Sequence, residues 1–281
     1  MNSTSQIPSM LITNTNHDRD KIMREANQEQ LMKEIREKIQ HIRNYKPKVG
    51  VFGNSGVGKS SLCNALFGKD IAKISDVEAC TRKPQEIFVG SNGSISGITL
   101  LDVPGIGEDP VRQAEYTALY KSLVPELDLV LWAIKADDRN YASGLDTYKE
   151  VFEQKQSPPV IFVITQTDKT NDMDDWNRQE YKPGGSQEAN IAIKENDVSN
   201  RFNISTRNII SIAVQVKEKK LTGISYNLKS LVELVVEALP NEKKYSFTRE
   251  TKEENVSQQA KISAEKGIFD SVKEMAGDAW D

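Results

Sequence analysis

Hydrophobic positions along the chain occur in two patterns, as short continuous runs and as residues spaced by three or four. The short runs have the length of buried strands. They lie at 48–52, 85–89, 95–101, 127–134, 158–164 and 208–214. One stretch with helical spacing begins at 61, and a second follows residue 139 and ends at 155. Two more cover 187–201 and 228–239. Strands that alternate with helices predict an α/β fold, with a mainly parallel, doubly wound sheet and helices on both faces.

The N-terminal segment combines a polar tail with a helical pattern. Residues 1–17 are rich in Ser, Thr and Asn, and we expect them to be disordered. Within 18–45, four apolar residues recur at spacings of four, four and three with charged residues between them, which predicts an amphipathic helix. The four are Leu31, Ile35, Ile39 and Ile42. This narrow apolar face is expected to pack on the central domain or on a helix from the other end of the chain, with dimerisation and membrane contact as alternatives.

The C-terminal segment, 241–281, carries a second helical stripe that is rich in small residues, which permit close approach of a neighbouring helix. The stripe consists of Val256, Ala260, Ala264, Gly267, Ile268, Ser271, Val272 and Met275. We expect this segment to pack against the N-terminal helix as a small α-helical module beside a central domain at 46–240, which Pro240 closes. Self-association and contact with a membrane surface are the alternatives for the stripe.

Composition narrows the class of protein. The 281 residues carry a formal net charge of −4, which gives no global basic field and no strong nucleic-acid signal. The two cysteines show neither a disulfide framework nor metal-site spacing, which suits a reducing compartment. The polar N-terminus does not have the pattern of a secretory signal, and no stretch approaches the roughly 18 apolar residues of a membrane span. We therefore expect a cytoplasmic protein.

A glycine-rich loop follows the first predicted strand. Residues 53–60 read Gly-Asn-Ser-Gly-Val-Gly-Lys-Ser, a full match to the P-loop pattern, and a predicted helix comes next. Backbone N–H groups of such a loop point at phosphates, beside the positive end of the helix. Lys59 is expected to reach the β and γ phosphates, Ser60 to bind Mg²⁺, and Ser61 to approach the α-phosphate. The other nucleotide-binding candidates are Asn54, Ser55, Gly56, Val57 and Gly58.

Two further positions are typical of a nucleotide switch. The strand at 95–101 runs directly into Asp102-Val103-Pro104-Gly105. Here the Asp102 carboxylate is expected to hold Mg²⁺ through water, and Gly105 to offer its N–H to the γ-phosphate. Thr81, in a preceding loop, is expected to bind Mg²⁺ through its hydroxyl and the γ-phosphate through its N–H. Loss of that phosphate would release the loop that follows Asp102.

A third motif follows the strand at 158–164 and reads Thr165-Gln166-Thr167-Asp168. All three motifs lie at carboxyl ends of predicted strands, where parallel sheets bind their ligands. A carboxylate at Asp168 can accept hydrogen bonds from both the N1–H and the exocyclic amine of guanine, an arrangement that the edge of adenine does not match. Guanine selectivity is therefore assigned to Asp168.

With these motifs in this order, residues 47–240 resemble the small GTPases of the translation-factor-related class, Era-like branch, and are most similar to the bacterial group of "GTPase family proteins". The resemblance implies a P-loop NTPase G domain that hydrolyses GTP to GDP and phosphate and acts as a switch. It assigns catalysis to Lys59, Thr81 and Gly105, with Mg²⁺ held by Ser60, Thr81 and Asp102. Ala213 and Val214 stand where the family has a base-contacting Ser-Ala-Lys element.

Three departures from the family pattern change the expectations. Thr165 and Gln166 replace the usual Asn-Lys pair, which predicts reduced affinity or looser base selectivity. Ile106 occupies the position of the glutamine that orients the attacking water in Ras-like proteins, which predicts slow intrinsic turnover. Gly56 stands where some relatives carry an asparagine that holds K⁺, so we do not expect potassium activation.

Other roles remain open at this level. The layout, with helices from both ends beside a G domain, resembles dynamin-like and immunity-related GTPases. This similarity favours a guanine-nucleotide-dependent assembly or a membrane-associated scaffold, and a homodimer through the G domain or the terminal helices. A ribosome-associated GTPase is the other alternative. The C-terminal segment has seven basic and nine acidic residues, which lowers the case for an RNA-binding appendage.

Overall fold

The computed structural model describes residues 10–67, 85–89, 97–102, 110–139, 142–152, 157–170, 173–217 and 220–277. Within these residues, one sheet has six strands in the order β2-β3-β1-β4-β5-β6, and β7 and β8 form a separate hairpin. The strands are β1 (Lys48–Gly53), β2 (Gln85–Val89), β3 (Ile98–Asp102), β4 (Leu129–Lys135), β5 (Val160–Thr165), β6 (Ile209–Ser211), β7 (Ala213–Lys217) and β8 (Lys220–Tyr226). Neighbours in the large sheet are parallel, except that β2 and β3 form the predicted antiparallel pair. The predicted mainly parallel α/β architecture is confirmed.

Helices connect most of these strands, as the sequence pattern predicts. They are α1 (Met10–Asn44), α2 (Lys59–Phe67), α3 (Pro110–Leu123), α4 (Ala142–Phe152), α5 (Gly185–Phe202), α6 (Leu228–Ala238), α7 (Asn241–Glu250) and α8 (Gln258–Ala276). Short 3₁₀ turns lie at Val124–Glu126, Thr167–Lys169, Met173–Asp175, Thr206–Asn208 and Glu253–Asn255. None of the helices described is both long enough and apolar enough to cross a bilayer.

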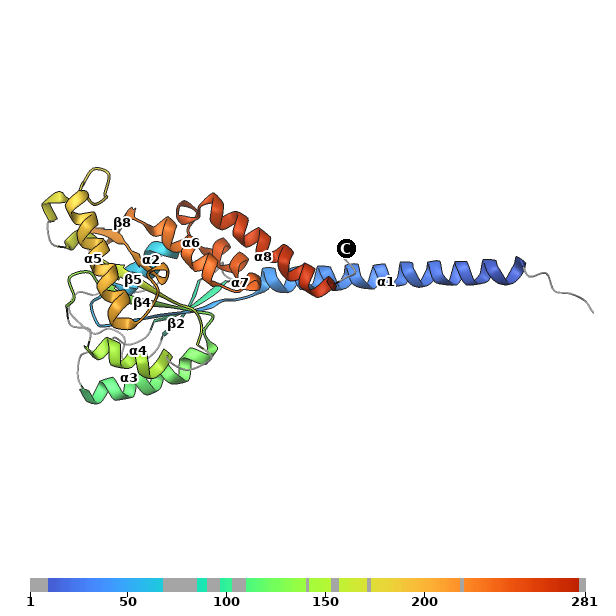
Figure 1. The fold of residues 1–281 in the computed structure, drawn as a ribbon, viewed down its shortest axis with the longest axis horizontal. Helices are drawn as coiled ribbons and strands as arrows, with labels where there is room; N and C mark the ends of the chain where they lie inside the picture. Colours follow the sequence, from blue (N-terminus) through green and yellow to red (C-terminus); the bar gives the residue numbers. More distant parts are fainter. Residues whose placement is uncertain are drawn as a thin grey trace, which may run out of the picture.

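The two faces of the large sheet bury alternate residues of the same strands. Val49 and Val51 of β1 share one hydrophobic cluster with α2, α6, α7 and α8. Phe52, the next residue along β1, joins the opposite cluster with α3, α4 and α5. Trp132 of β4 lies at the centre of this second cluster, with its indole ring 6.3 Å from the Phe52 ring. Period-two burial of this kind requires helices on both sides of the sheet, as Figure 1 shows.

Helices α7 and α8 share the core of the central domain. The Phe247 ring of α7 is fully buried and packs edge-on against Phe67 of α2, with ring centroids 6.0 Å apart. Ala260 of α8 belongs to the same cluster. Gly267 explains the small-residue stripe, because a Cβ there would lie 2.7 Å from the carbonyl oxygen of Asn241. Helix α8 therefore packs against α7 and α6 as well as against α1, the partner that the sequence analysis named first.

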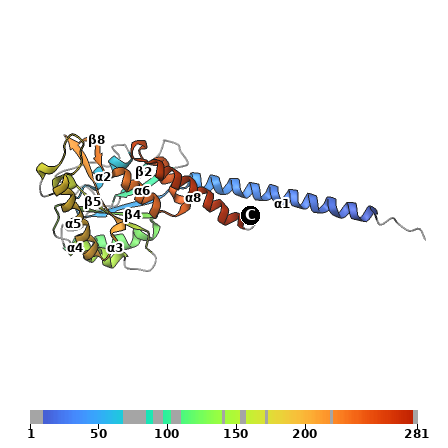
Figure 2. The ribbon, with the colours of Figure 1, turned by 45° about the horizontal axis from the view of Figure 1, so that its top comes forward.

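Helix α1 extends away from the rest of the molecule, and α8 lies along the part of it nearest the body (Figure 1). Figure 2 shows the same arrangement after a turn about the horizontal axis. Ile35 and Ile42 are buried, whereas residues 21–30 are all exposed. The helix begins at Met10, inside the segment expected to be disordered. Once its C-terminal half is docked, each added residue gains a backbone hydrogen bond without a new nucleation cost, which is the physical reason for the longer helix.

A buried carboxylate fixes the base of α1 to the sheet. Asp128, just before β4, accepts hydrogen bonds from the Tyr45 hydroxyl at 2.9 and 3.0 Å and from the Lys48 backbone N–H at 2.9 Å. Lys243 of α7 forms an ion pair with the same carboxylate. In addition, the Ser246 hydroxyl donates to the carbonyl of Ile42 at 3.1 Å. The end of α1, the start of β1 and α7 are thereby joined at the edge opposite the predicted motifs.

Replacing Phe247 with alanine tests whether α7 belongs to the main core. The substitution leaves a cavity against Phe67 and is expected to lower the free energy of unfolding by about 3 to 5 kcal/mol. Urea denaturation measures this loss, and Phe269→Ala is the control because Phe269 of α8 is 50% exposed. The control is expected to change stability by less than about 0.5 kcal/mol. Equal effects of the two substitutions would contradict a shared core.

Candidate nucleotide-binding site

The predicted phosphate-binding loop connects the end of β1 to the start of α2. Gly53 closes the strand with φ +135°, a conformation that L side chains rarely adopt, and a Cβ there would lie 2.2 Å from the carbonyl oxygen of Ala133. Only glycine permits this approach to β4. The loop then passes directly into helix α2 at Lys59. Its backbone N–H groups therefore lie at a helix N-terminus, the arrangement that binds phosphate groups.

The Lys59 ammonium group lies across this loop. Its Nζ donates to the carbonyl oxygens of Gly53 at 3.2 Å and Asn54 at 3.0 Å. Ser60 and Ser61 follow in the first turn of α2 and are partly exposed. The amide group of Asn54 is directed toward Asp138, with a distance of 3.4 Å from Nδ2 to the carboxylate. The Lys59 side chain thus contacts the backbone of the loop itself, and the Asn54 side chain contacts the segment that follows β4.

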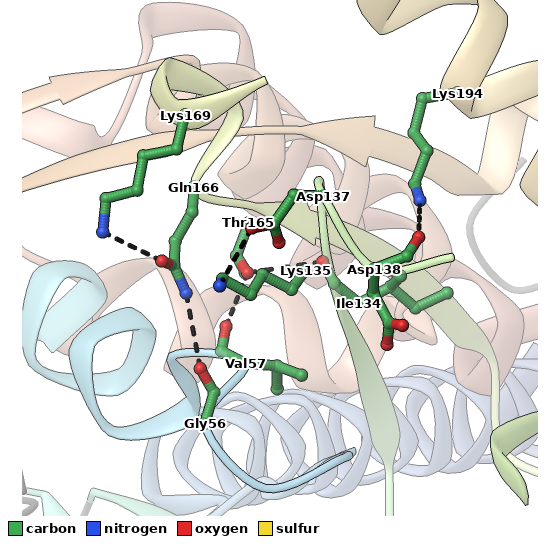
Figure 3. Close-up of polar contacts among 10 residues, drawn as sticks. All are labelled: Gly56, Val57, Ile134, Lys135, Asp137, Asp138, Thr165, Gln166, Lys169 and Lys194. Atoms are coloured by element: carbon green, nitrogen blue, oxygen red, sulfur yellow. Dashed lines mark hydrogen bonds and ion pairs between the residues drawn. The ribbon is translucent and has the colours of Figure 1, made fainter. Parts of the chain in front are cut away.

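Thr165 and Gln166, the two residues that replace the usual Asn-Lys pair, both contact the phosphate-binding loop (Figure 3). The buried Thr165 hydroxyl donates to the Val57 carbonyl at 2.5 Å and lies 3.3 Å from the Ile134 carbonyl. Gln166 has a left-handed backbone conformation, and its Nε2 donates to the Gly56 carbonyl at 3.4 Å. These contacts join the end of β5 to the loop, a connection that the sequence analysis did not predict.

Lys169 extends this arrangement by donating to Oε1 of Gln166 at 3.0 Å (Figure 3). Asp168, between them in sequence, is half-buried. Burial raises the pKa of its carboxyl group above the ordinary value, while the Lys169 charge and a hydrogen bond from Tyr181 act in the opposite direction. The Tyr181 hydroxyl lies 3.3 Å from Oδ2 of Asp168. The carboxylate thus has a donor on one side and a cation nearby.

An open cavity of about 490 Å³ lies beside these residues. Its walls come from the end of the phosphate-binding loop and α2, from the segment that follows β5, from residues 176–181 and from β7. The charged side chains lining it are Asp168, Lys169, Arg178 and Lys217. Gly58 and Ser61 of the predicted phosphate site and Asp168 of the predicted base site line the same cavity, whereas Lys59 and Ser60 are not among the described residues that line it.

The strand predicted at 208–214 is divided in the structure. β6 ends at Ser211, and Ala213 begins β7, which pairs with β8 in the small hairpin. Val214 lines the cavity. Ala213 instead packs in a hydrophobic cluster with Trp176 and Tyr181, and it is absent from the described residues that line the cavity. The base contact expected of Ala213 and Val214 stays a prediction.

The structure also places residues that sequence reasoning missed. Tyr181 and Arg178 line the cavity, although neither belongs to a recognised motif. Their only signal in the sequence is an aromatic and polar insertion between the base-recognition motif and the next helix. Trp176 of the same insertion is buried, with its ring 5.3 Å from that of Tyr181.

Several candidates lie outside the described residues. These are Thr81, Val103, Pro104, Gly105 and Ile106. Asp102 is the last residue of β3, and its backbone lies opposite Val51 in the parallel pairing with β1. Among the residues that the structure describes, His, Cys, Asp and Glu side chains form no group of three or more arranged to hold a metal ion.

Comparison with known proteins agrees with this geometry. Residues 48–166 match the family model described as 50S ribosome-binding GTPase. The protein YkfA of Escherichia coli K12 is 48% identical over 133 residues, which is 47% of this chain and 46% of YkfA. YfjP of the same organism is 44% identical over 135 residues, 48% of this chain and 46% of YfjP. The chain thus matches about half the length of these relatives.

A solved structure extends the fold comparison beyond the family match. Era in complex with MgGDPNP and nucleotides 1506–1542 of 16S ribosomal RNA superimposes with a TM-score of 0.50 at 22% identity, covering 69% of this chain and 57% of that chain. This likeness concerns the fold alone. Residues 48–166 are therefore similar to the family described as 50S ribosome-binding GTPases, and the chain has a P-loop GTPase fold like that of Era.

Proposed function

We propose that this protein binds GTP and GDP, hydrolyses GTP to GDP and phosphate, and works as a nucleotide-dependent switch with slow intrinsic turnover. The hydrogen bond from Thr165 to the Val57 carbonyl carries the proposal, because it joins the base-recognition segment to the phosphate-binding loop beside one continuous cavity. In this assignment Asp168 accepts hydrogen bonds from guanine, and Lys59 binds the β and γ phosphates.

The residues of the phosphate end fit a magnesium ion. Mg²⁺ prefers hard oxygen ligands and is usually held by one or two protein groups together with phosphates and waters. Ser60 in the first turn of α2 and Asp102 at the end of β3 belong to elements that flank β1, and Thr81 is the third candidate. When bound, the ion neutralises charge that develops on the phosphate oxygens. The role of Ser60, Asp102 and Thr81 in this proposal is to position the ion.

Hydrolysis in this proposal is an in-line attack of water on the γ-phosphate, without a covalent intermediate. Lys59 stabilises the transferred group, and backbone N–H groups of the loop and of Gly105 act with it. Ile106 has no polar group that orients a water molecule, so we expect slow turnover of the isolated protein. A partner or a second copy that supplies such a group would accelerate it.

A second candidate function is a nucleotide-dependent association with ribosomal subunits, which the description of the matching family favours. Under this candidate, the protein sediments with purified ribosomal subunits when a non-hydrolysable GTP analogue is bound, and stays in the supernatant with GDP. Sedimentation that is equal in both nucleotide states, or absent in both, would contradict it.

Lys59→Ala and Asp168→Asn test the two ends of the site. Titration calorimetry of the purified protein with Mg²⁺ is expected to show binding of GTP and GDP and much weaker binding of ATP. Loss of Lys59 removes a charge-assisted contact and is expected to abolish detectable binding and turnover. Loss of the Asp168 charge is expected to weaken GDP binding by about 10- to 100-fold, since hydrogen bonds to charged groups contribute about 1.5 to 3 kcal/mol.

Asp146→Asn provides the matched control, because Asp146 is an exposed carboxylate of α4. Equal ATP and GTP affinity in the unmodified protein would overturn the role of Asp168. Phosphate release should also be measured at increasing protein concentration. Turnover per molecule that rises with concentration indicates a site completed by self-association, whereas guanine-selective binding without turnover at any concentration contradicts the hydrolytic switch and favours a nucleotide-dependent scaffold.

Thr165→Val tests the contact between β5 and the loop. The substitution keeps the side-chain volume but leaves the buried Val57 carbonyl without its donor, which is expected to cost about 1 to 3 kcal/mol of stability. Urea denaturation with and without GDP is expected to show this loss, together with weaker GDP binding. Thr206→Val is the control, because Thr206 is exposed. Unchanged GDP affinity in Thr165→Val would show that the contact supports the fold and not the nucleotide site.

A further inference from the structure

Residues 173–184, between the base-recognition motif and α5, form a short, internally hydrogen-bonded insertion. Asn177 and Lys182 exchange backbone hydrogen bonds of 2.9 and 3.2 Å across it. At its base, the Gly184 N–H donates to the Asp175 carbonyl at 2.9 Å, and the Asp175 carboxylate accepts from the Gln187 N–H in the first turn of α5 at 3.1 Å. The insertion is therefore fixed to α5 at its base.

Tyr181 is the residue of this insertion that contacts the predicted base site. It has φ +50°, which is uncommon for a residue other than glycine and recurs at functional positions. The residue is 5% exposed, and its ring packs edge-on against Trp176, which in turn packs edge-on against Tyr226 of β8 with ring centroids 5.5 Å apart. These contacts fix the ring, so the position of its hydroxyl group is defined by packing and not by solvent.

The Tyr181 hydroxyl donates to Oδ2 of Asp168 at 3.3 Å, and both residues line the same cavity. Burial and the neighbouring carboxylate raise the pKa of Tyr181 above its ordinary value, so the hydroxyl keeps its proton at neutral pH. The other charged groups facing this cavity are Lys169, Arg178 and Lys217, which come from the segment after β5, the insertion and β7. Among these cavity-lining residues, Tyr181 is the one whose side chain donates a hydrogen bond to Asp168.

We propose that Tyr181 is a positioning residue for base recognition, whose hydroxyl group orients the Asp168 carboxylate so that both of its oxygens meet the Watson–Crick edge of guanine. The inference rests on the proposed function. The carboxylate torsion of an aspartate is broad and soft, so a fixed donor on one oxygen selects one orientation from many. Recognition of two donors on guanine needs that orientation, whereas recognition of one donor tolerates rotation.

Tyr181→Phe is the direct test, because it keeps the buried ring and removes only the hydroxyl group. Titration calorimetry with GDP and with inosine diphosphate, which lacks the exocyclic amine, separates two-point from one-point recognition. We expect GDP affinity to fall by about tenfold and inosine diphosphate affinity by about threefold or less, so that the ratio of the two decreases. Tyr226→Phe is the matched control, since Tyr226 belongs to the same aromatic cluster.

The pH dependence of GDP binding gives a second readout. Guanine recognition needs the Asp168 carboxylate and is lost as pH falls through the pKa of that group. The Tyr181 hydrogen bond lowers this pKa, so its removal raises the pKa. The acid limb of GDP binding is therefore expected to move to higher pH in Tyr181→Phe and to stay in place in Tyr226→Phe.

The outcomes separate this inference from the proposed function. An unchanged ratio of GDP to inosine diphosphate affinity with an unchanged acid limb would overturn the role of Tyr181. An equal loss for GDP, inosine diphosphate and ADP would also overturn it, because it indicates damaged packing. Failure of the proposed function shows itself differently, as an unmodified protein that does not prefer GDP to ADP.

Discussion

The site depends on how tightly the phosphate-binding loop is held by two strands, β4 and β5, which lie on the same side of β1. At the start of the loop, Gly53 brings the backbone against the Ala133 carbonyl of β4, at a distance that leaves no room for a Cβ. Further along the loop, the Val57 carbonyl accepts a hydrogen bond from the Thr165 hydroxyl at the end of β5. Because β1 lies between β3 and β4 in the sheet, the loop emerges at the centre of the sheet edge. The base segment is then placed by its own contact with the loop.

Most of the sheet could be predicted from the sequence, because the signals that mark a buried strand are local. A buried strand has a continuous apolar run, and the glycine-rich loop and Asp168 have fixed positions after such runs. The run at 208–214 is misleading for a physical reason. Ile212 donates its N–H to Ile164 of β5 at 2.8 Å, yet the chain then leaves the large sheet, and β7 pairs with β8. β8 is mostly exposed, so it lacks the apolar alternation that marks a strand.

The contact partners of the terminal helices could not be predicted in the same way. A stripe of small residues indicates close packing but does not name the neighbour, and here Gly267 fits against Asn241 of α7. Helix α7 itself is mostly polar, and its membership of the core depends on Phe247. Likewise, Thr165 contacts Val57, which is far away in sequence, and Tyr181, which lies outside any motif, contacts Asp168. Tertiary contacts of this kind leave no periodic signal.

Helix α2, like the strands, runs between the end of the sheet that carries the motifs and the opposite end. Its first residue is Lys59 of the phosphate-binding loop. At its other end, the carbonyls of Ala65 and Leu66 accept hydrogen bonds from the Asn255 side chain at 2.9 Å and the Lys252 N–H at 2.8 Å, both in the connection between α7 and α8. The last six residues of α2 are buried, so the end of the helix is packed between the core and that connection. Helix α2 therefore links the nucleotide site to the connection between α7 and α8, the helices that hold the base of α1.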